Sequence, residues 1–290
     1  MRFGLMMKSN NFQLGVGSHK GNDVHLTVIY DSVSTAPDLQ TGQGFACVAE
    51  VGPTTVLFDT GSDGSILLAN MRKLGIDPGQ IQIVIISHNR SGHVGGLYDF
   101  LAVNQDAVVY VPESFPFSII ENIKKAGAEV IPIISPMELQ PNIFTLGEFT
   151  SYFKEQAMAL RTSKGIVVIT GCAHHSILTI MQKAKEIFPE EPLFLALGGF
   201  HFGGLGSKDK TNILAGLKKL RLKKIAPSYC CEETCRMLLK KDFGENYVEM
   251  GVGGIIIINS IKENKRNIRI RRKKLTEDHY LLMKAIAELA

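Results

Sequence analysis

Short apolar runs rich in Val and Ile alternate along the chain with segments whose apolar residues recur at helical spacing. The short runs are typical of buried strands, and the helical spacing is typical of helices packed on one face. In the first half, the strands predicted in this way are residues 25–30, 45–51, 55–58, 81–86, 107–111 and 129–134. The helices predicted between them are residues 65–74, 95–103 and 114–126.

The second half repeats this organisation. It opens near Asn142 with hairpin-like strands, and further strands are predicted at residues 165–170, 193–197 and 254–259. The predicted helices are residues 176–187, 211–220 and 232–241. Hairpins that open each half, followed by alternating strands and helices, predict an α/β fold. In this fold two mixed sheets pack together with helices outside, as an αββα sandwich of two similar halves.

Composition favours one large globular domain. Of 290 residues, 45% are hydrophobic and 21% are charged, which excludes disorder and collagen-like fibres. We expect this domain to span residues 1–260. An extension, residues 261–290, is expected to follow it as a basic strip and a final helix capped by Thr276. That helix is a candidate contact for a homo-oligomer.

Positive charge is concentrated in the extension. The formal net charge is +4, but residues 262–274 hold eight Lys or Arg and one Glu, so the rest of the chain sums to −3. A slightly acidic body lacks the broad basic face of a nucleic-acid-binding domain, so nucleic acid is not the expected partner. A weaker alternative is that the basic strip and last helix bind nucleic acid or another partner.

Cysteine usage and hydropathy bear on the compartment. The five Cys residues are odd in number and scattered, which argues against a disulfide framework and favours a reducing cytosol. No window approaches the ~18 consecutive apolar residues of a membrane span, and the N-terminus has no apolar block of signal-peptide length. The expected setting is cytoplasmic, with no membrane partner.

The most informative segment is residues 83–97, in which a strand runs into a polar loop that carries His88 and His93. Residues five apart lie about 140° around a helix, so these two side chains can converge only from a turn. On spacing alone, a histidine at a strand terminus is most often a hydrogen-bonded polar residue. The site, if there is one, is a loop site.

Four other motifs occur in order with this segment. They are Leu57-Phe58-Asp59-Thr60-Gly61, Thr170-Gly171-Cys172-Ala173-His174, Gly198-Gly199-Phe200-His201 and Pro227-Ser228-Tyr229-Cys230. Over roughly residues 25–259 the five motifs resemble those of the metallo-β-lactamase superfamily. The motifs at residues 170–174 and 198–201, together with residues 246–254, resemble the subgroup that includes 7,8-dihydropterin-6-yl-methyl-aminobenzene phosphate synthases.

The resemblance implies the αββα fold and a centre that binds zinc or another divalent metal. The residues that match its ligand and catalytic positions are the candidate ligands His88, His93, His174 and His201 and the candidate catalytic residues Asp59 and Arg90. Asp59 is the only obvious acid among the motifs, and it would either orient a histidine or act as an exposed ligand. Asp-Thr-Gly after a strand is also a common turn.

Three ligand positions depart from the family pattern. Arg90 stands where the family has a second His, Gly92 where it has Asp, and Tyr229 where it has the last His. A guanidinium has no lone pair to donate and stays charged. The altered motifs therefore imply at most one ion, or none. A single ion would be held through His88, His174 and either His93 or His201.

Two further features have a functional and a structural interpretation. Cys231 and Cys235 would share one helical face, which favours core packing over a thiolate metal site. The glycine-rich residues 198–206 can present backbone N–H groups to a phosphate, although flexible loops also need glycine.

Two functions compete. The first is a metal-dependent hydrolase or transferase acting on a small, ester- or phosphate-containing molecule, with metal-activated water near His88, His93 and His174. The second is a non-catalytic relative that binds an anionic small molecule through bidentate contacts from Arg90. The four histidines favour the first and Arg90 favours the second. We adopt the first, with an altered metal centre.

Overall fold

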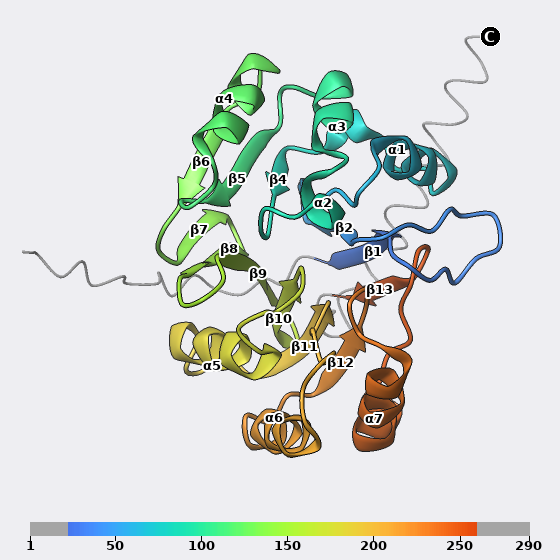
Figure 1. Cartoon of the computed structure of the whole chain (residues 1–290), viewed down its shortest axis with the longest axis vertical. Coiled ribbons are helices and arrows are strands. Elements are labelled where there is room, and N and C mark those ends of the chain that lie inside the picture. The colour runs from blue at the N-terminus through green and yellow to red at the C-terminus, as the bar shows by residue number, and fades with distance from the viewer. Residues whose placement is uncertain (1–22, 260–290) are drawn as a thin grey trace, which may run out of the picture.

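The computed structural model describes residues 23–259, whose strands form two mixed sheets packed face to face (Figure 1). The strands of the first sheet are, in spatial order, β13 (Ile255–Ile258), β1 (Val24–Tyr30), β2 (Ala46–Val51), β3 (Thr54–Phe58), β4 (Ile83–Ile85), β5 (Val108–Pro112) and β6 (Val130–Ile133). Those of the second are β12 (Lys224–Pro227), β11 (Leu193–Gly198), β10 (Gly165–Thr170), β9 (Glu155–Thr162), β8 (Ile143–Phe149) and β7 (Met137–Gln140).

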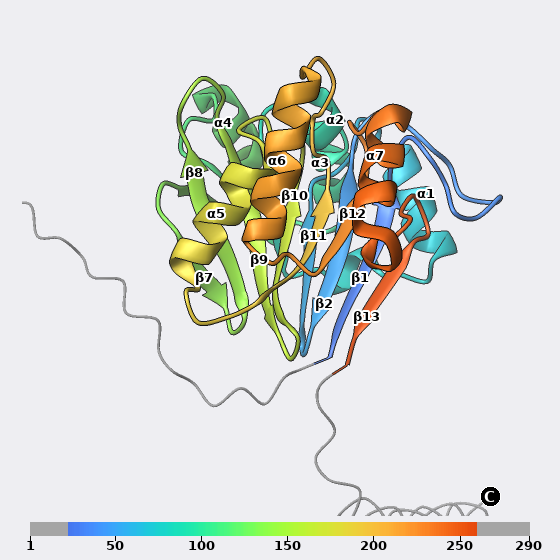
Figure 2. The same ribbon diagram turned by 90° about the horizontal axis from the view of Figure 1, so that it is seen from below.

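The helices lie on the outer faces of the two sheets. On the first sheet they are α1 (Gly64–Lys73), α2 (Ser91–Val94), α3 (Leu97–Val103) and α4 (Phe117–Lys125), and on the second α5 (Ile177–Ile187), α6 (Ser207–Lys219) and α7 (Glu233–Phe243). Two short 3₁₀ helices, Pro78–Gln80 and Gly244–Asn246, complete the helical elements of the described residues. Figure 2 shows α5, α6 and α7 as a layer in front of the second sheet. The predicted αββα sandwich is confirmed.

Strand β10 shows how the layers are held together. All six of its residues are buried, and successive side chains of a strand point to opposite faces. Val167 and Ile169 belong to the apolar cluster between the two sheets, whereas Ile166 and Val168 belong to the cluster under the outer helices. A continuous apolar run is therefore the correct pattern for a strand that is covered on both sides.

Both halves change from antiparallel to parallel pairing partway through the sheet. In the first half β1, β2 and β3 pair antiparallel, and β3 to β6 pair parallel. In the second half β7 to β10 pair antiparallel, and β10, β11 and β12 pair parallel. Parallel strands end at the same edge of a sheet, so the loops after β3, β4, β10, β11 and β12 become available to build one site.

The structure differs from the sequence prediction in several elements. The helix predicted at residues 95–103 corresponds to α3, which begins at Leu97. A separate short helix, α2, precedes it, so His93 lies in a helix rather than in a loop. Strands β7 and β12 were not predicted individually, and α6 begins four residues before the predicted start at residue 211. The basic strip and the helix predicted after Thr276 lie outside the described residues. None of the helices in residues 23–259 has the length and apolarity to cross a membrane.

Candidate metal centre

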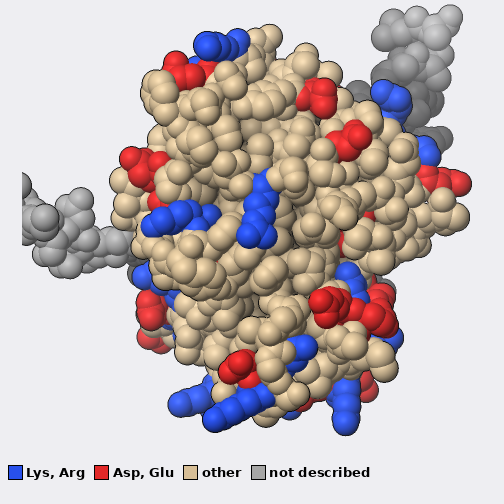
Figure 3. Space-filling view, viewed as in Figure 1, with Lys and Arg blue, Asp and Glu red and all other residues tan. Residues whose placement is uncertain are grey.

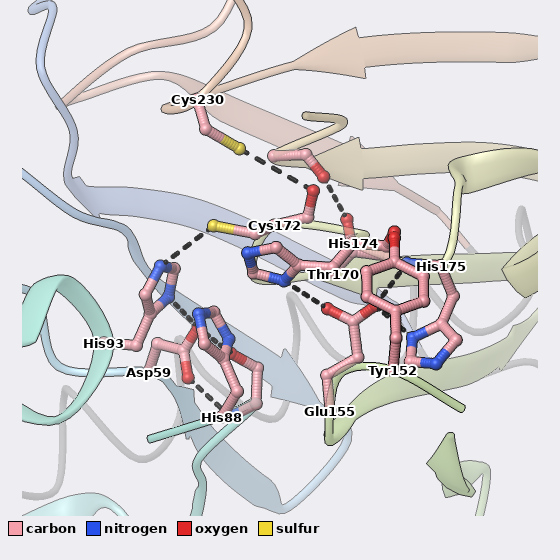
Figure 4. A network of polar contacts seen from close by, with 12 residues as sticks. Asp59, His88, His93, Tyr152, Glu155, Thr170, Cys172, His174, His175 and Cys230 are labelled. Atoms are coloured by element: carbon pink, nitrogen blue, oxygen red, sulfur yellow. Dashed lines mark hydrogen bonds and ion pairs between the residues drawn. The ribbon is translucent and has the colours of Figure 1, made fainter. Parts of the chain in front are cut away.

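Three buried histidines meet where the loops after β4 and β10 approach each other (Figure 4). The ring centroid of His88 lies 4.1 Å from that of His93 and 4.9 Å from that of His174. Their side chains are almost removed from solvent, with residue exposures of 0%, 1% and 7% for His88, His93 and His174. The structure therefore brings three of the four candidate histidines into one cluster.

Each of these imidazoles is held at Nδ1 by a neighbouring oxygen. The three contacts join His93 to Oδ2 of Asp59 (2.7 Å), His174 to Oε2 of Glu155 (3.0 Å) and His88 to Oγ of Ser87 (2.8 Å). An acceptor at Nδ1 fixes the proton there and leaves the lone pair on Nε2. Nε2 of His88 and Nε2 of His174 are buried without a hydrogen-bond partner, a costly condition for a polar atom. Held Nδ1 and open Nε2 atoms fit a metal ion.

Asp59 supports the histidines from below. It is fully buried, and its carboxylate accepts hydrogen bonds from the backbone N–H (2.6 Å) and the hydroxyl (2.7 Å) of Ser87 as well as from His93. Because the Ser87 hydroxyl donates to Asp59, its oxygen is left to accept from His88. A Cβ at position 171 would overlap the Ser87 hydroxyl and approach Asp59 Oδ2 to 2.8 Å, so Gly171 makes room for this network. Asp59 is a supporting group rather than an exposed ligand.

Glu155 is a second acid of the site, so Asp59 is not the only one. Its Oε2 accepts from His174, and its Oε1 accepts from Nδ1 (2.9 Å) and the backbone N–H (2.9 Å) of His175. Burial raises the pKa of Glu155, but the hydrogen bonds from His174 and His175 outweigh burial and hold that pKa below its usual range. The two adjacent histidines therefore bind opposite oxygens of one carboxylate.

Backbone strain is concentrated in the loops of this site. Of the non-glycine residues with positive φ in the described chain, Asp59 (58°), Ala173 (57°), Ser176 (74°) and His201 (43°) lie in these loops. Such conformations cost of order 1–3 kcal/mol each and persist only where the surroundings enforce them. The loops are thus held in unusual shapes that set the direction of the histidines.

Cys172 adds a sulfur atom to the cluster. Its Sγ lies 3.2 Å from Nε2 of His93, and the residue is 4% exposed. Two sets of donor atoms lie within 4.8 Å of one another, one from His88, His93 and Cys172 and the other from His88, Glu155 and His174. Cys172 stands in the third sequence motif, but it was not predicted as a donor.

The two cysteines of this region perturb each other. The interaction with Cys230, followed by burial, raises the pKa of the Cys172 thiol. The same interaction, with hydrogen bonds from His201, lowers the pKa of Cys230.

Burial, and then the neighbouring His93 and His174, lower the pKa of His88 well below 6.5. Burial therefore favours the uncharged imidazole of His88.

Arg90 lies at the rim of the site and is exposed. Its guanidinium carbon is 4.7 Å from the ring centroid of Phe153, which in turn lies 3.8 Å from that of His174 and 5.3 Å from that of His88. No ion pair of Arg90 is found among residues 23–259, and Asp63, a candidate partner, caps α1 instead. The guanidinium therefore stacks on Phe153, next to the ring of His174.

Gly92 and Tyr229 are spatially linked. A Cβ on Gly92 would lie 3.1 Å from Cα of Gly44 and 3.5 Å from the phenol oxygen of Tyr229. The Tyr229 ring centroid is 5.7 Å from that of His93, and burial raises the pKa of this phenol. Tyr229 therefore fills space into which an aspartate at position 92 would extend.

The remaining candidates are placed differently from the predictions. His201 is exposed and belongs to neither donor set, although its ring centroid is 4.8 Å from that of His174. Cys231 and Cys235 do lie in the apolar core, but they are joined by a disulfide, which was not predicted. A Cβ on Gly198 or Gly199 would overlap a carbonyl of the β10 segment, so close packing explains these glycines without a phosphate.

Comparison with known proteins defines the class of this fold and site. Residues 40–149 match the model of the metallo-β-lactamase superfamily. Tm1679, described as a metal-dependent hydrolase of the β-lactamase superfamily, has 24% identity and a TM-score of 0.69, over 81% of this chain and 99% of its own. Human tRNase Z, short form, has 13% identity and a TM-score of 0.54, over 81% and 99%. The chain therefore has the metallo-β-lactamase fold, and residues 40–149 match the sequence model of that superfamily.

One curated relative indicates a particular subgroup of the superfamily. The 7,8-dihydropterin-6-methyl-4-(β-D-ribofuranosyl)-aminobenzene-5'-phosphate synthase of Methanocaldococcus jannaschii is 26% identical to this chain. The match covers 69% of this chain and 83% of the relative. The sequence resemblance to the metallo-β-lactamase superfamily and to this subgroup is confirmed.

Proposed function

We propose that the protein is a metal-dependent hydrolase or transferase that acts on a small, phosphate-bearing substrate with one divalent ion, zinc by preference. The observation that carries this proposal is the set of buried imidazoles held at Nδ1 with Nε2 directed into one cluster. A divalent ion bound in this cluster, where His88 belongs to both sets of donor atoms, would supply Lewis acidity toward a phosphoryl or carbonyl oxygen.

The chain's own residues would orient both the ion and the substrate. Asp59 and Glu155 hold His93 and His174 in one tautomer and one orientation before any ion binds. Phe153 covers His174 and restricts access of water from that side. Arg90, exposed and without an ion pair in the described chain, can donate two parallel hydrogen bonds to a phosphate.

Steric and charge arguments support one ion rather than two. Arg90 offers a positive charge and no lone pair at a family ligand position. Gly92 offers no side chain, and the phenol of Tyr229 fills the adjacent space. A second dication would meet no donor at positions 90 and 92, and at position 229 only a phenol whose pKa is raised by burial, which disfavours the phenolate that a metal ion needs.

Turnover assays on the metal-free and reloaded protein test this function. The substrates are a nitrophenyl phosphomonoester, a nitrophenyl phosphodiester and a nitrophenyl carboxylate ester, with zinc, manganese or iron(II) added to chelated protein. We expect metal-dependent release of nitrophenol from at least one phosphorus ester, and its loss in His88→Ala and His174→Ala. Turnover that survives chelation, or survives both substitutions, would contradict the proposal.

A second candidate function is supported by the free guanidinium. In it the protein binds an anionic small molecule through Arg90 and catalyses nothing. The face shown in Figure 3 has scattered Lys and Arg side chains and no continuous basic area, so anion binding on this face would depend on individual groups. Calorimetric binding of phosphate or pterin phosphates by protein that shows no turnover with any metal would favour this alternative.

A further inference from the structure

We infer that Cys172 is a metal ligand, and that the ion is held by Nε2 of His88, Nε2 of His93 and the Cys172 thiolate. This inference rests on the proposed metal dependence and specifies its donor set. It assigns a sulfur ligand in the region where Gly92 and Tyr229 no longer supply family donors.

The distances fit such a set. A tetrahedral zinc ion with bonds of about 2.0 Å to nitrogen and 2.3 Å to sulfur places its donors about 3.3–3.5 Å apart. Cys172 Sγ is already 3.2 Å from His93 Nε2, and all three donor atoms lie within 4.8 Å of one another. Side-chain adjustments of about one ångström would therefore close the set around an ion.

The loop after β10 directs Cys172 and His174 to different partners. Gly171 lets the backbone pass close to Ser87 and Asp59, and Ala173 turns the chain through a left-handed conformation. As a result, Cys172 faces His93 while His174 faces Glu155 (Figure 4). The sulfur is buried beside an imidazole nitrogen whose other nitrogen is fixed by Asp59.

The charge balance also favours a thiolate. Two neutral imidazoles bring no negative charge to a dication, and the nearby Asp59 carboxylate is held against His93 and Ser87 rather than among the donors of this set, while Arg90 adds a positive charge at the rim. On binding, a sulfur–metal bond forms as the thiol proton leaves to solvent, so the net charge of the ion and its ligands falls from +2 to +1. A sulfur donor also favours zinc or cobalt over magnesium or manganese.

Cobalt spectroscopy on the full chain tests this assignment, with Cys230→Ser as the matched control. Cys230 is the neighbouring thiol, with Sγ 3.7 Å from the Cys172 carbonyl oxygen, and it belongs to neither donor set. We expect one cobalt(II) ion to give a near-ultraviolet thiolate-to-cobalt charge-transfer band. The band should be lost in Cys172→Ser and kept in Cys230→Ser.

Zinc affinity, measured by competition with a chromophoric chelator, provides a second readout. Cys172→Ser and Cys172→Ala should weaken zinc by at least the roughly 10–100-fold that loss of a supporting residue costs. Circular dichroism of the metal-free variants checks that both are folded, and if one is not, the other carries the comparison.

The outcomes separate this inference from the proposed function. Bound cobalt without a charge-transfer band, or a band lost only in Cys230→Ser, overturns the Cys172 assignment and leaves metal dependence intact. Equal zinc affinities for folded Cys172→Ser and unaltered protein also overturn it. Failure of the unaltered chain to bind either metal overturns both.

Discussion

The floor and the rim of the site have different chemistry. The floor consists of His88, His93, Cys172, His174 and the acids Asp59 and Glu155. All six residues are at most 7% exposed. The rim consists of the exposed Arg90, the half-buried Phe153 and Tyr229, and the buried Gly92 beside the Tyr229 phenol. The floor has a set of possible donors with their supporting hydrogen bonds, whereas the rim holds the three residues that we align with family ligand positions.

This contrast reflects how each region is attached to the fold. The floor residues bond to one another and to the ends of β3, β4 and β10, so replacing one leaves buried polar atoms without partners. Among residues 23–259 the side chains of Arg90 and Tyr229 make no hydrogen bond, so shortening either one leaves no buried partner unsatisfied. Ligand loss at the rim is therefore compatible with an intact fold and an intact floor.

The largest effect is expected when the floor is broken at Asp59. Asp59→Asn replaces a charged acceptor that serves both His93 and Ser87, so the free energy of unfolding should fall by about 1–3 kcal/mol. Metal affinity should fall roughly 10–100-fold, because His93 loses its orientation. Chemical denaturation and chelator competition measure the two effects.

The matched control for this substitution is Asp63→Asn. Asp63 is an exposed acid that caps α1, and Asn is an equally good N-cap. Its stability and metal affinity should remain near those of the unaltered protein. Equal losses in Asp59→Asn and Asp63→Asn would mean that the floor has no special role.

Returning the family's ligand residues to the rim tests the same comparison by adding donors instead of removing them. The triple change Arg90→His, Gly92→Asp and Tyr229→His should raise metal occupancy, because it returns three donors to family ligand positions. Gly92→Asp alone should not, because its side chain meets Gly44 and the Tyr229 phenol. Occupancy that stays flat in the triple variant would show that these positions are not the family ligand positions.

Arg90 tests whether the rim binds an anion. Each charge-assisted hydrogen bond contributes about 1.5–3 kcal/mol, so Arg90→Ala should weaken a micromolar phosphate ligand about tenfold or more. Arg90→Lys should recover only part of this loss, because it lacks the planar fork. Calorimetric titration of phosphate and pterin phosphates measures the three affinities, and equal values would make Arg90 structural.

Lowering the pH should reduce the free energy of unfolding of the metal-free protein through the protonation of His88. This is the smallest expected effect. The folded-state pKa of His88 is lowered below 6.5, so the unfolded chain takes up the proton first as the pH falls. Its contribution to stability is complete above pH 6.5 and is lost below it, by up to about 1.4 kcal/mol per pH unit. Denaturation of chelated protein between pH 7 and 5 should show a shallower slope in His88→Gln.

The fold could be predicted further than the site. Continuous apolar runs such as β10 identify strands covered on both sides, and the ordered motifs identify the superfamily. Strand β12 was not predicted because it is short and begins with Lys224. The role of Glu155 was not predicted because an acid at the start of a hairpin strand carries no local signal. Its role exists only because β9 lies beside β10 and places it under His174.

The contact between Cys172 and His93 was not predicted for a related reason. The third motif shows Cys172 two residues before His174, but the sequence does not show which way each side chain turns. The left-handed Ala173 between them sends the two side chains to different partners. Spacing alone could therefore suggest the loop but not the donor set.

The central claim is that the floor of the site binds one ion in spite of the altered rim. Plasma mass spectrometry of the full chain, purified without chelator and then equilibrated with zinc and desalted, tests it most directly. We predict one tightly held ion per chain, lost in His88→Ala and retained in Arg90→Ala. Two ions per chain, or none in protein that is folded, would contradict this account.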